Sequence, residues 1–165
     1  MSEMPEEIMQ NEEDTQHGKY LTFALGKEVF GIEIRFVTEI VGLQKISYIP
    51  DCPDYVKGII NLRGKIIPVI DMNLKFKKSS TEYTDRTCII VIDVQDLTVG
   101  LIVDYVDEVA TISDKDIVPP PNYKTGFQNR YIRGIGKSGE DIQLLLDCEL
   151  LFADEEIQTL NQIKK

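Results

Sequence analysis

The chain contains an internal repeat, which constrains its fold more than any other feature of the sequence. Residues 37–40 (VTEI) recur as residues 106–109 (VDEV), an offset of 69 positions. After a proline-rich stretch the offset becomes 76, and the matching positions are Gly58, Asp71, Leu74 and Phe76 with Gly134, Asp147, Leu150 and Phe152. Each copy is too short to bury much apolar surface alone, so the two copies are expected to pack together.

Short alternating or apolar segments predict about five strands and one short helix in each copy. Strands are expected at residues 20–25, 29–34 and 37–43, in a hairpin over 56–71, and at 87–94, 97–104, 106–112, 131–137 and 142–146. Asp71 and Asp147 are expected to cap the short helices. Because five short strands curl readily into a closed sheet, the sequence predicts a mostly β fold of two small five-stranded barrels that share a hydrophobic interface.

The domain boundaries follow from composition. Residues 1–18 hold six acidic residues and no lysine or arginine, which predicts a disordered acidic tail. Residues 19–152 are expected to form the folded domain, with halves at roughly 19–85 and 86–152 and with exchange of strands between the halves left open. Residues 75–86 are polar and indicate a linker, and residues 153–165 indicate a C-terminal helical tail.

Composition also limits the partners. A net charge of −10 makes nucleic acid and anionic membrane surfaces poor partners. The chain has no apolar run of the length of a signal peptide or membrane span, which favours a cytosolic protein without direct membrane insertion. Its three cysteines, Cys52, Cys88 and Cys148, are scattered, and they are expected to be reduced thiols.

Signals of enzyme chemistry are nearly absent. The single histidine, His17, falls in the predicted tail, and the chain lacks glycine-rich nucleotide motifs and a Gly-x-Ser-x-Gly motif. Asp104, Asp107 and Glu108 form a candidate carboxylate cluster, which an exposed strand end explains better. No catalytic residue, metal or cofactor is therefore expected, and a surface for protein partners is the favoured alternative.

The tip of the hairpin over residues 56–71 is the main candidate for such a surface. Gly64 is expected to supply the unusual backbone angles of the turn. Residues 61–64 (NLRG) correspond to residues 137–140 (KSGE) in the second copy, so the fold itself does not demand this tip. Arg63 has no counterpart, whereas Glu39 corresponds to Glu108. We expect Glu39 and Arg63 to form an ion pair that holds the arginine ready for binding.

Residues 58–71 (GIINLRGKIIPVID) resemble the signature hairpin of the bacterial chemotaxis coupling proteins, the CheW family. Residues 30–32 (FGI) and 37–40 fit the upstream pattern of that family, and residues 132–135 (IRGI) and 144–147 (LLLD) fit its downstream half. The resemblance covers roughly residues 19–152. It implies two five-stranded SH3-like barrels, in agreement with the repeat.

The resemblance also implies a function. It implies a non-enzymatic adaptor that couples methyl-accepting transmembrane chemoreceptors, at their cytoplasmic tip, to the regulatory domain of the histidine kinase CheA in ternary complexes. Such an adaptor is cytoplasmic and recruited to receptor arrays at the inner face of the membrane. The receptor-binding positions that carry over are Val37, Glu39, Gly58, Asn61, Leu62 and Arg63.

The kinase-binding face is placed less sharply, near Val41 and Leu43. Two other functions remain open at this point. One is a small β-barrel that binds a ligand or catalyses a reaction. The other is a self-assembling structural module, which predicts homo-oligomers in the absence of kinase and receptor.

Overall fold

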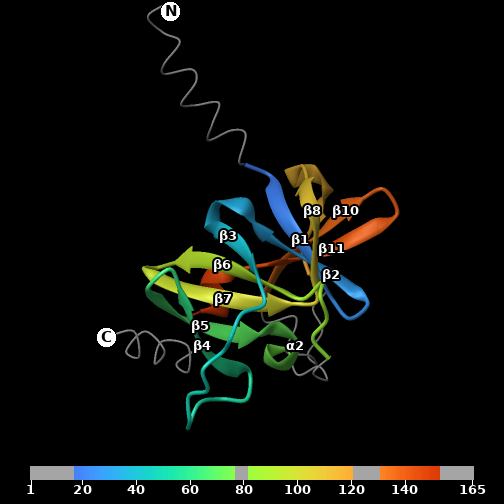
Figure 1. Ribbon diagram of the computed structural model, residues 1–165. Helices are drawn as coiled ribbons and strands as arrows, with labels where there is room; N and C mark the ends of the chain where they lie inside the picture. The colour runs from blue at the N-terminus through green and yellow to red at the C-terminus, as the bar shows by residue number, and fades with distance from the viewer. Residues whose placement is uncertain (1–16, 77–81, 121–130, 153–165) are drawn as a thin grey trace, which may run out of the picture.

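The computed structural model describes residues 17–76, 82–120 and 131–152 (Figure 1). The first copy of the repeat supplies β1 (Lys19–Leu25), β2 (Glu28–Glu33), β3 (Val37–Gly42), β4 (Val56–Leu62), β5 (Lys65–Asp71) and the short helix α2 (Met72–Lys75). The second copy supplies β6 (Cys88–Val94), β7 (Leu97–Val103), β8 (Tyr105–Thr111), β9 (Ile117–Val118), β10 (Ile132–Ser138), β11 (Asp141–Leu146) and the short helix α4 (Cys148–Leu151). Two 3-10 turns, Ile34–Phe36 and Asp114–Asp116, follow β2 and precede β9.

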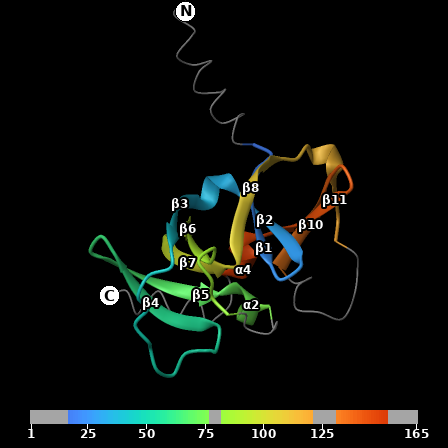
Figure 2. The ribbon, with the colours of Figure 1, turned by 45° about the vertical axis from the view of Figure 1, so that its right-hand side comes forward.

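The strands form two sheets that lie side by side (Figures 1 and 2). The six-stranded sheet has the order β8-β1-β2-β11-β10-β9, and the five-stranded sheet has the order β3-β6-β7-β5-β4. Each sheet combines the first hairpin of one copy with later strands of the other copy. Hairpin β1–β2 pairs with β8 and, in parallel, with β11, whereas hairpin β6–β7 pairs with β3 and, in parallel, with β5. The two copies have therefore exchanged their first hairpins.

Both sheets close in the same way. In the five-stranded sheet, Ser47 lies beyond β3 and pairs with Ile59 of β4, through hydrogen bonds of 2.8 and 2.9 Å between their backbone N–H and C=O groups. In the six-stranded sheet, β9 lies beyond β8 and pairs with β10. Each pairing brings the two edges of a sheet together. The expected pair of small barrels is confirmed, although one of them has six strands where five were expected, and we name them the five-stranded and six-stranded barrels.

The shared hydrophobic interface between the barrels is also confirmed. Alternate residues of β1, among them Leu21, Phe23 and Leu25, join one large buried cluster with side chains of both sheets. Aromatic rings run through this cluster, with centroid distances of 6.0 Å from Phe23 to Phe30, 5.4 Å from Phe30 to Phe76 and 6.0 Å from Phe76 to Tyr131. Because each fully buried phenylalanine contributes about 1.5–3 kcal/mol to the free energy of unfolding, this cluster between the barrels is a main source of stability.

The interiors of the two barrels differ. The five-stranded barrel is filled by aliphatic side chains, namely Ile60, Leu62, Ile67, Val69, Ile89, Val91 and Ile102. The smaller apolar cluster of the six-stranded barrel contains Tyr20, Ile112 and Leu145. Buried Thr22 and Gln143 also belong to strands of this barrel. Buried polar residues also occur on strands of the five-stranded barrel, namely Asp71 and Thr98.

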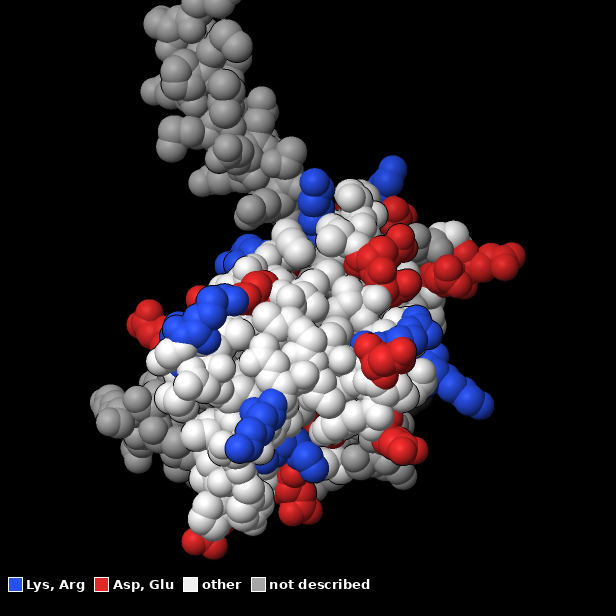
Figure 3. Space-filling view, in the orientation of Figure 1, with Lys and Arg blue, Asp and Glu red and all other residues white. Residues whose placement is uncertain are grey.

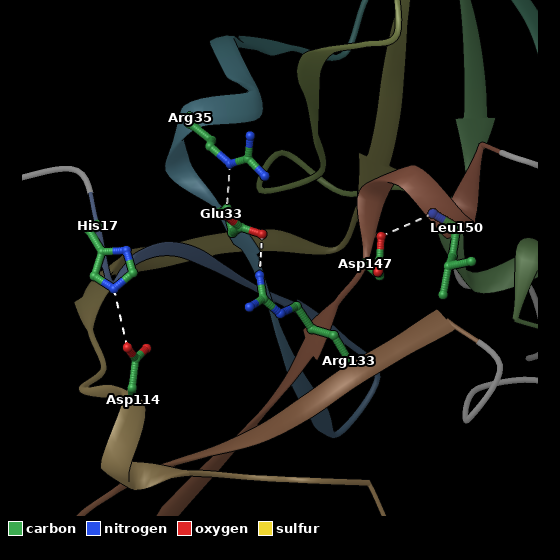
Figure 4. Close-up of polar contacts among 7 residues, drawn as sticks. All are labelled: His17, Glu33, Arg35, Asp114, Arg133, Asp147 and Leu150. Carbon is green, nitrogen blue, oxygen red and sulfur yellow. Dashed lines mark hydrogen bonds and ion pairs between the residues drawn. The ribbon is translucent and has the colours of Figure 1, made fainter. Parts of the chain in front are cut away.

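Both predicted helix caps are present. The Asp71 Oδ1 atom accepts hydrogen bonds from the backbone N–H of Asn73 at 2.9 Å and of Leu74 at 3.3 Å. The Asp147 Oδ1 atom accepts one from Leu150 N–H at 3.0 Å (Figure 4). Each carboxylate satisfies N–H groups that the first turn of a helix leaves without partners.

The polar stretch over residues 75–86 is more ordered at its ends than a linker. Lys75 is buried on α2, with its Nζ atom 4.4 Å from the centroid of the Tyr55 ring. Tyr83 donates a hydrogen bond of 2.7 Å to Asp71 Oδ2. The linker prediction is therefore wrong at these two residues, because their side chains pack against the domain, while residues 77–81 lie outside the described residues.

The N-terminal boundary also differs from the prediction. Gly18 accepts a hydrogen bond from Ile112 N–H at 2.7 Å, and His17 Nε2 lies 3.3 Å from Asp114 Oδ2 (Figure 4). His17 is therefore part of the described fold. Residues 1–16, 153–165 and most of the proline-rich loop lie outside the described residues.

Candidate functional site

The hairpin tip between β4 and β5 is a two-residue turn. Leu62 pairs with Lys65, which leaves Arg63 and Gly64 as the central residues, with φ of +52° and +89°. Positive φ at both positions is what a type I′ turn requires. The Asn61 Oδ1 atom accepts a hydrogen bond of 2.8 Å from Gly64 N–H and braces the turn. The role predicted for Gly64 is confirmed.

The expected ion pair is present across the closure of the five-stranded barrel. Arg63 Nη2 donates a hydrogen bond to Glu39 Oε2, although β3 and β4 stand at opposite ends of the sheet order. The hydrogen bond from Arg63 holds the pKa of Glu39 below its ordinary value, and the same bond raises the pKa of Arg63. The Arg63 side chain is 69% exposed, so solvent screens the pair and its main effect is to orient the guanidinium.

Two of the predicted receptor-binding residues are buried, and a third is half-buried. Leu62 is only 7% exposed and packs inside the five-stranded barrel. Val37 is half-buried against the large cluster between the barrels, and Gly58 is buried. Glu39, Asn61 and Arg63 are the predicted residues whose polar side chains reach solvent. The exposed part of the predicted surface is thus narrower than the set of six.

Gly58 has a structural role of its own. Its φ is +145°, and a Cβ atom at this position would lie 2.0 Å from the carbonyl oxygen of Ser47. The glycine sits at a β-bulge, where the pairing of β4 with β5 shifts. Its counterpart Gly134 sits at the equivalent bulge of β10, where a Cβ would lie 2.6 Å from Ile117 Cγ2. Both glycines allow the close approach that shuts a barrel.

A shallow cleft of about 320 Å³ lies beside the ion pair. Lys65 donates a hydrogen bond of 3.1 Å to Thr98 Oγ1, and the Thr98 hydroxyl donates to Asp93 Oδ1. These two linked hydrogen bonds were not predicted from the sequence. The signal for them was Asp93, a charged residue within an otherwise apolar strand.

The predicted kinase-binding residues lie on and just beyond β3. Val41 is half-buried against the interior of the five-stranded barrel, and Leu43 is 39% exposed. Two more exposed apolar side chains, Ile40 at 45% and Tyr48 at 78%, lie in this segment. Figure 3 shows an uncharged expanse over β3, with basic side chains below it, where Figure 1 places the segment that follows β3. Period-two alternation would have pointed to Ile40, which alternates with half-buried Glu39 and Val41.

The described residues include no group of three or more His, Cys, Asp or Glu side chains arranged to hold a metal ion. Likewise, the part of the chain that the structure describes has no helix long and apolar enough to cross a membrane. Cys52, Cys88 and Cys148 are free, and burial raises the pKa of Cys148 to about 12.

Comparison with known proteins identifies the family. Residues 19–156 match the family model described as a CheW-like domain. The chain belongs to the CheW-like family. The chemotaxis protein CheW of Klebsiella aerogenes is 35% identical over 152 residues, which cover 92% of both chains. The CheW protein of Treponema pallidum is 37% identical over 144 residues, which cover 85% of both chains.

Among solved structures, the scaffolding protein TtCheW of Thermoanaerobacter tengcongensis aligns with a TM-score of 0.77 and 35% identity, over 84% of this chain and 94% of that chain. The CheW-like fold predicted from the hairpin and the repeat is therefore confirmed. So is the function class, a chemotaxis scaffold rather than an enzyme.

Proposed function

We propose that this CheW-like chain couples transmembrane chemoreceptors to the histidine kinase CheA. In this proposal it is cytoplasmic and is recruited to receptor arrays at the inner face of the membrane. It binds the cytoplasmic receptor tip through the surface around Arg63 and the regulatory domain of the kinase through the surface around Val41 and Leu43.

The ion pair between Arg63 and Glu39 is the observation that carries the receptor side. An arginine in a two-residue turn, fixed by a carboxylate from a different strand, loses little freedom when it binds a partner. Asn61 braces the same turn. Val37, Gly58 and Leu62 contribute indirectly, because they set the position of the strands that carry the exposed residues.

The kinase side is supported by exposed apolar surface. Leu43 and Ile40 expose about two-fifths of their surface on or next to β3, and Tyr48 is more exposed still. Apolar and aromatic side chains of this kind form the centres of protein interfaces. Because Ile40 adjoins Glu39 in the chain, the two proposed surfaces lie close to each other on the five-stranded barrel.

Coupling then follows from simultaneous binding. A scaffold that holds receptor and kinase together raises their local concentration and fixes their relative orientation. To transmit a signal, its contacts must also favour one state of the kinase over the other.

The test is binding of the full chain to a receptor signalling fragment, measured by isothermal titration calorimetry with and without CheA. Arg63→Ala should weaken receptor binding about tenfold or more, as hot-spot residues do, while its melting temperature stays near that of the parent. Arg133→Ala is the matched control. It removes the same charge and also breaks an ion pair, since Arg133 Nη1 donates to Glu33 Oε1 on the six-stranded barrel (Figure 4).

Equal receptor binding by the parent and Arg63→Ala would contradict the proposed receptor surface. Absence of a ternary complex with the parent chain would contradict the coupling function as a whole. Sedimentation of the pure chain as a large homo-oligomer would favour the self-assembling module instead.

A further inference from the structure

The six-stranded barrel has a cleft of its own, with a volume of about 510 Å³. Through the repeat it corresponds to the cleft beside Arg63. Asp107 and Glu108 stand where the five-stranded barrel has Thr38 and Glu39, and Val29, Asp141 and Gln143 stand where it has Thr98, Lys65 and Ile67. The two clefts are therefore equivalent positions of one duplicated architecture with different side chains.

Their charges differ. The cleft of the five-stranded barrel contains Arg63 and Lys65 together with Glu39 and Asp93, whereas the residues that correspond to the two cations in the second copy are Gly139 and Asp141. The acidic residues that line the cleft of the six-stranded barrel are Glu28, Asp107, Glu108, Glu140 and Asp141. Lys27 is the one cation among the described residues that line it. Figure 3 shows acidic side chains gathered on the side where Figure 1 places β8 and β10.

One residue that lines the same cleft carries an unpaired polar atom. Gln143 lines it and is only 8% exposed, and its Oε1 atom is buried without a hydrogen-bond partner among the described residues. A buried carbonyl oxygen of this kind is costly unless a donor reaches it. The fold does not require an amide here, because the equivalent residue is Ile67, which packs in an aliphatic core.

The remaining walls of the cleft are apolar. Val29, Leu144 and Ile142 line it, and Ile142 is 58% exposed. A ligand that suits this lining has an apolar stem, a positive charge and several hydrogen-bond donors. An arginine side chain has all three, since its methylene groups cover apolar surface and its guanidinium presents five N–H donors in a plane.

We propose that this cleft is a docking site for an arginine side chain of a protein partner. The guanidinium donates to Gln143 Oε1 and to the rim carboxylates, and its stem lies along Ile142 and Leu144. In the five-stranded barrel the chain supplies the arginine itself, as Arg63. In the six-stranded barrel the equivalent position is a glycine, and the partner supplies the cation. This site is on the other barrel and does not depend on the proposed receptor surface.

The probe is a five-residue peptide, acetylated and amidated, with one arginine between glycine and serine residues. Its binding to the ¹⁵N-labelled full chain is followed by NMR. We expect saturable shifts of the backbone amides of residues 27–29, 107–108 and 140–144 and of the Gln143 side-chain amide. The same peptide with citrulline, which has the shape of arginine without its charge, should not bind.

Two sets of variants test the roles of the residues. Gln143→Ile copies the other barrel, so it should keep or raise the melting temperature while it weakens peptide binding about tenfold. The pair Glu140→Gln and Asp141→Asn should also weaken binding. Asp116→Asn with Glu149→Gln removes the same charge from exposed positions outside the cleft and should leave binding unchanged.

The proposal is overturned if the arginine and citrulline peptides shift the same residues with equal affinity. It is also overturned if Gln143→Ile binds as the parent does, or if this variant unfolds at a clearly lower temperature, which would give the amide a structural role. Shifts of the cleft residues that depend on the concentration of the chain alone would indicate a second copy as the occupant, and would refute a separate protein partner.

Discussion

Replacing Gly58 with alanine would place a methyl group where the structure has the carbonyl oxygen of Ser47. The ideal Cβ position lies 2.0 Å from that oxygen and 2.9 Å from Ile46 Cγ2. Neither neighbour is free to move far, because Ser47 is held to Ile59 by two backbone hydrogen bonds. The bridge that closes the five-stranded barrel therefore has to shift or break.

The expected loss of stability has two parts. A φ of +145° is strained for any residue with a Cβ, at about 1–3 kcal/mol. Forcing a methyl group into a packed contact costs about 1–3 kcal/mol more. The sum is about 4 kcal/mol, which corresponds to a melting temperature lower by about 8–16 °C in a domain of this size.

Two other glycines separate these contributions. Gly64 has a φ of +89° and nothing within 4 Å of its Cβ position, so Gly64→Ala should cost only the backbone strain, about 1–2 kcal/mol. Gly42 has neither a positive φ nor a close neighbour, so Gly42→Ala should change stability by about 0.5 kcal/mol or less.

The assay is urea denaturation followed by circular dichroism, with a thermal melt of each variant. The expected order, from the most to the least stable variant, is Gly42→Ala, then Gly64→Ala, then Gly58→Ala. If Gly58→Ala is as stable as Gly64→Ala, the argument from the Ser47 contact is wrong. If Gly58→Ala is as stable as Gly64→Ala but binds the receptor more weakly than the parent, Gly58 belongs to the binding surface directly.

Further predictions concern buried polar groups. Burial raises the pKa of Cys148 from 9.0 to about 12. As the pH rises, the thiol therefore ionises in the unfolded chain before it ionises in the folded chain. The free energy of unfolding consequently falls as the pH rises from about 9 to 12. Between pH 8 and pH 10 the parent should lose about 1.4 kcal/mol more than Cys148→Ala in urea titrations, and equal losses would contradict this. Tyr83→Phe removes the hydroxyl that donates to buried Asp71, so it should cost about 1–3 kcal/mol in the same titrations. Tyr48→Phe, at a residue 78% exposed, is the control that should be near neutral.

The sequence predicted the features that depend on local pattern or on the repeat. The strands, the caps at Asp71 and Asp147 and the Gly64 turn follow from periodicity and turn chemistry. The ion pair between Glu39 and Arg63 followed from placing Glu39 on a strand and Arg63 at the hairpin tip of the same small unit. The family followed from the hairpin, and its model matches residues 19–156.

Other features depend on contacts that no local pattern encodes. Strand β9 has two residues, which is too few for a period to show. Leu62 is the exception, because it shares the buried phase of Ile60 along β4, and period-two alternation places it inside the barrel. The contact of Gly58 with Ser47 joins two segments whose approach is set only when the barrel closes. The structural role of Gly58 was for this reason not predictable from the sequence.

The exchange of hairpins between the copies has a consequence for the order of folding. Hairpin β1–β2 is synthesised first, yet its parallel neighbour β11 ends at residue 146. The six-stranded barrel thus cannot close on the ribosome until nearly the whole domain has emerged. The five-stranded barrel needs only β3 to β7, which end at residue 103, and it is free to close earlier. The barrel that carries Arg63 is therefore expected to form first. The six-stranded barrel then packs against its apolar face, which becomes part of the shared interface.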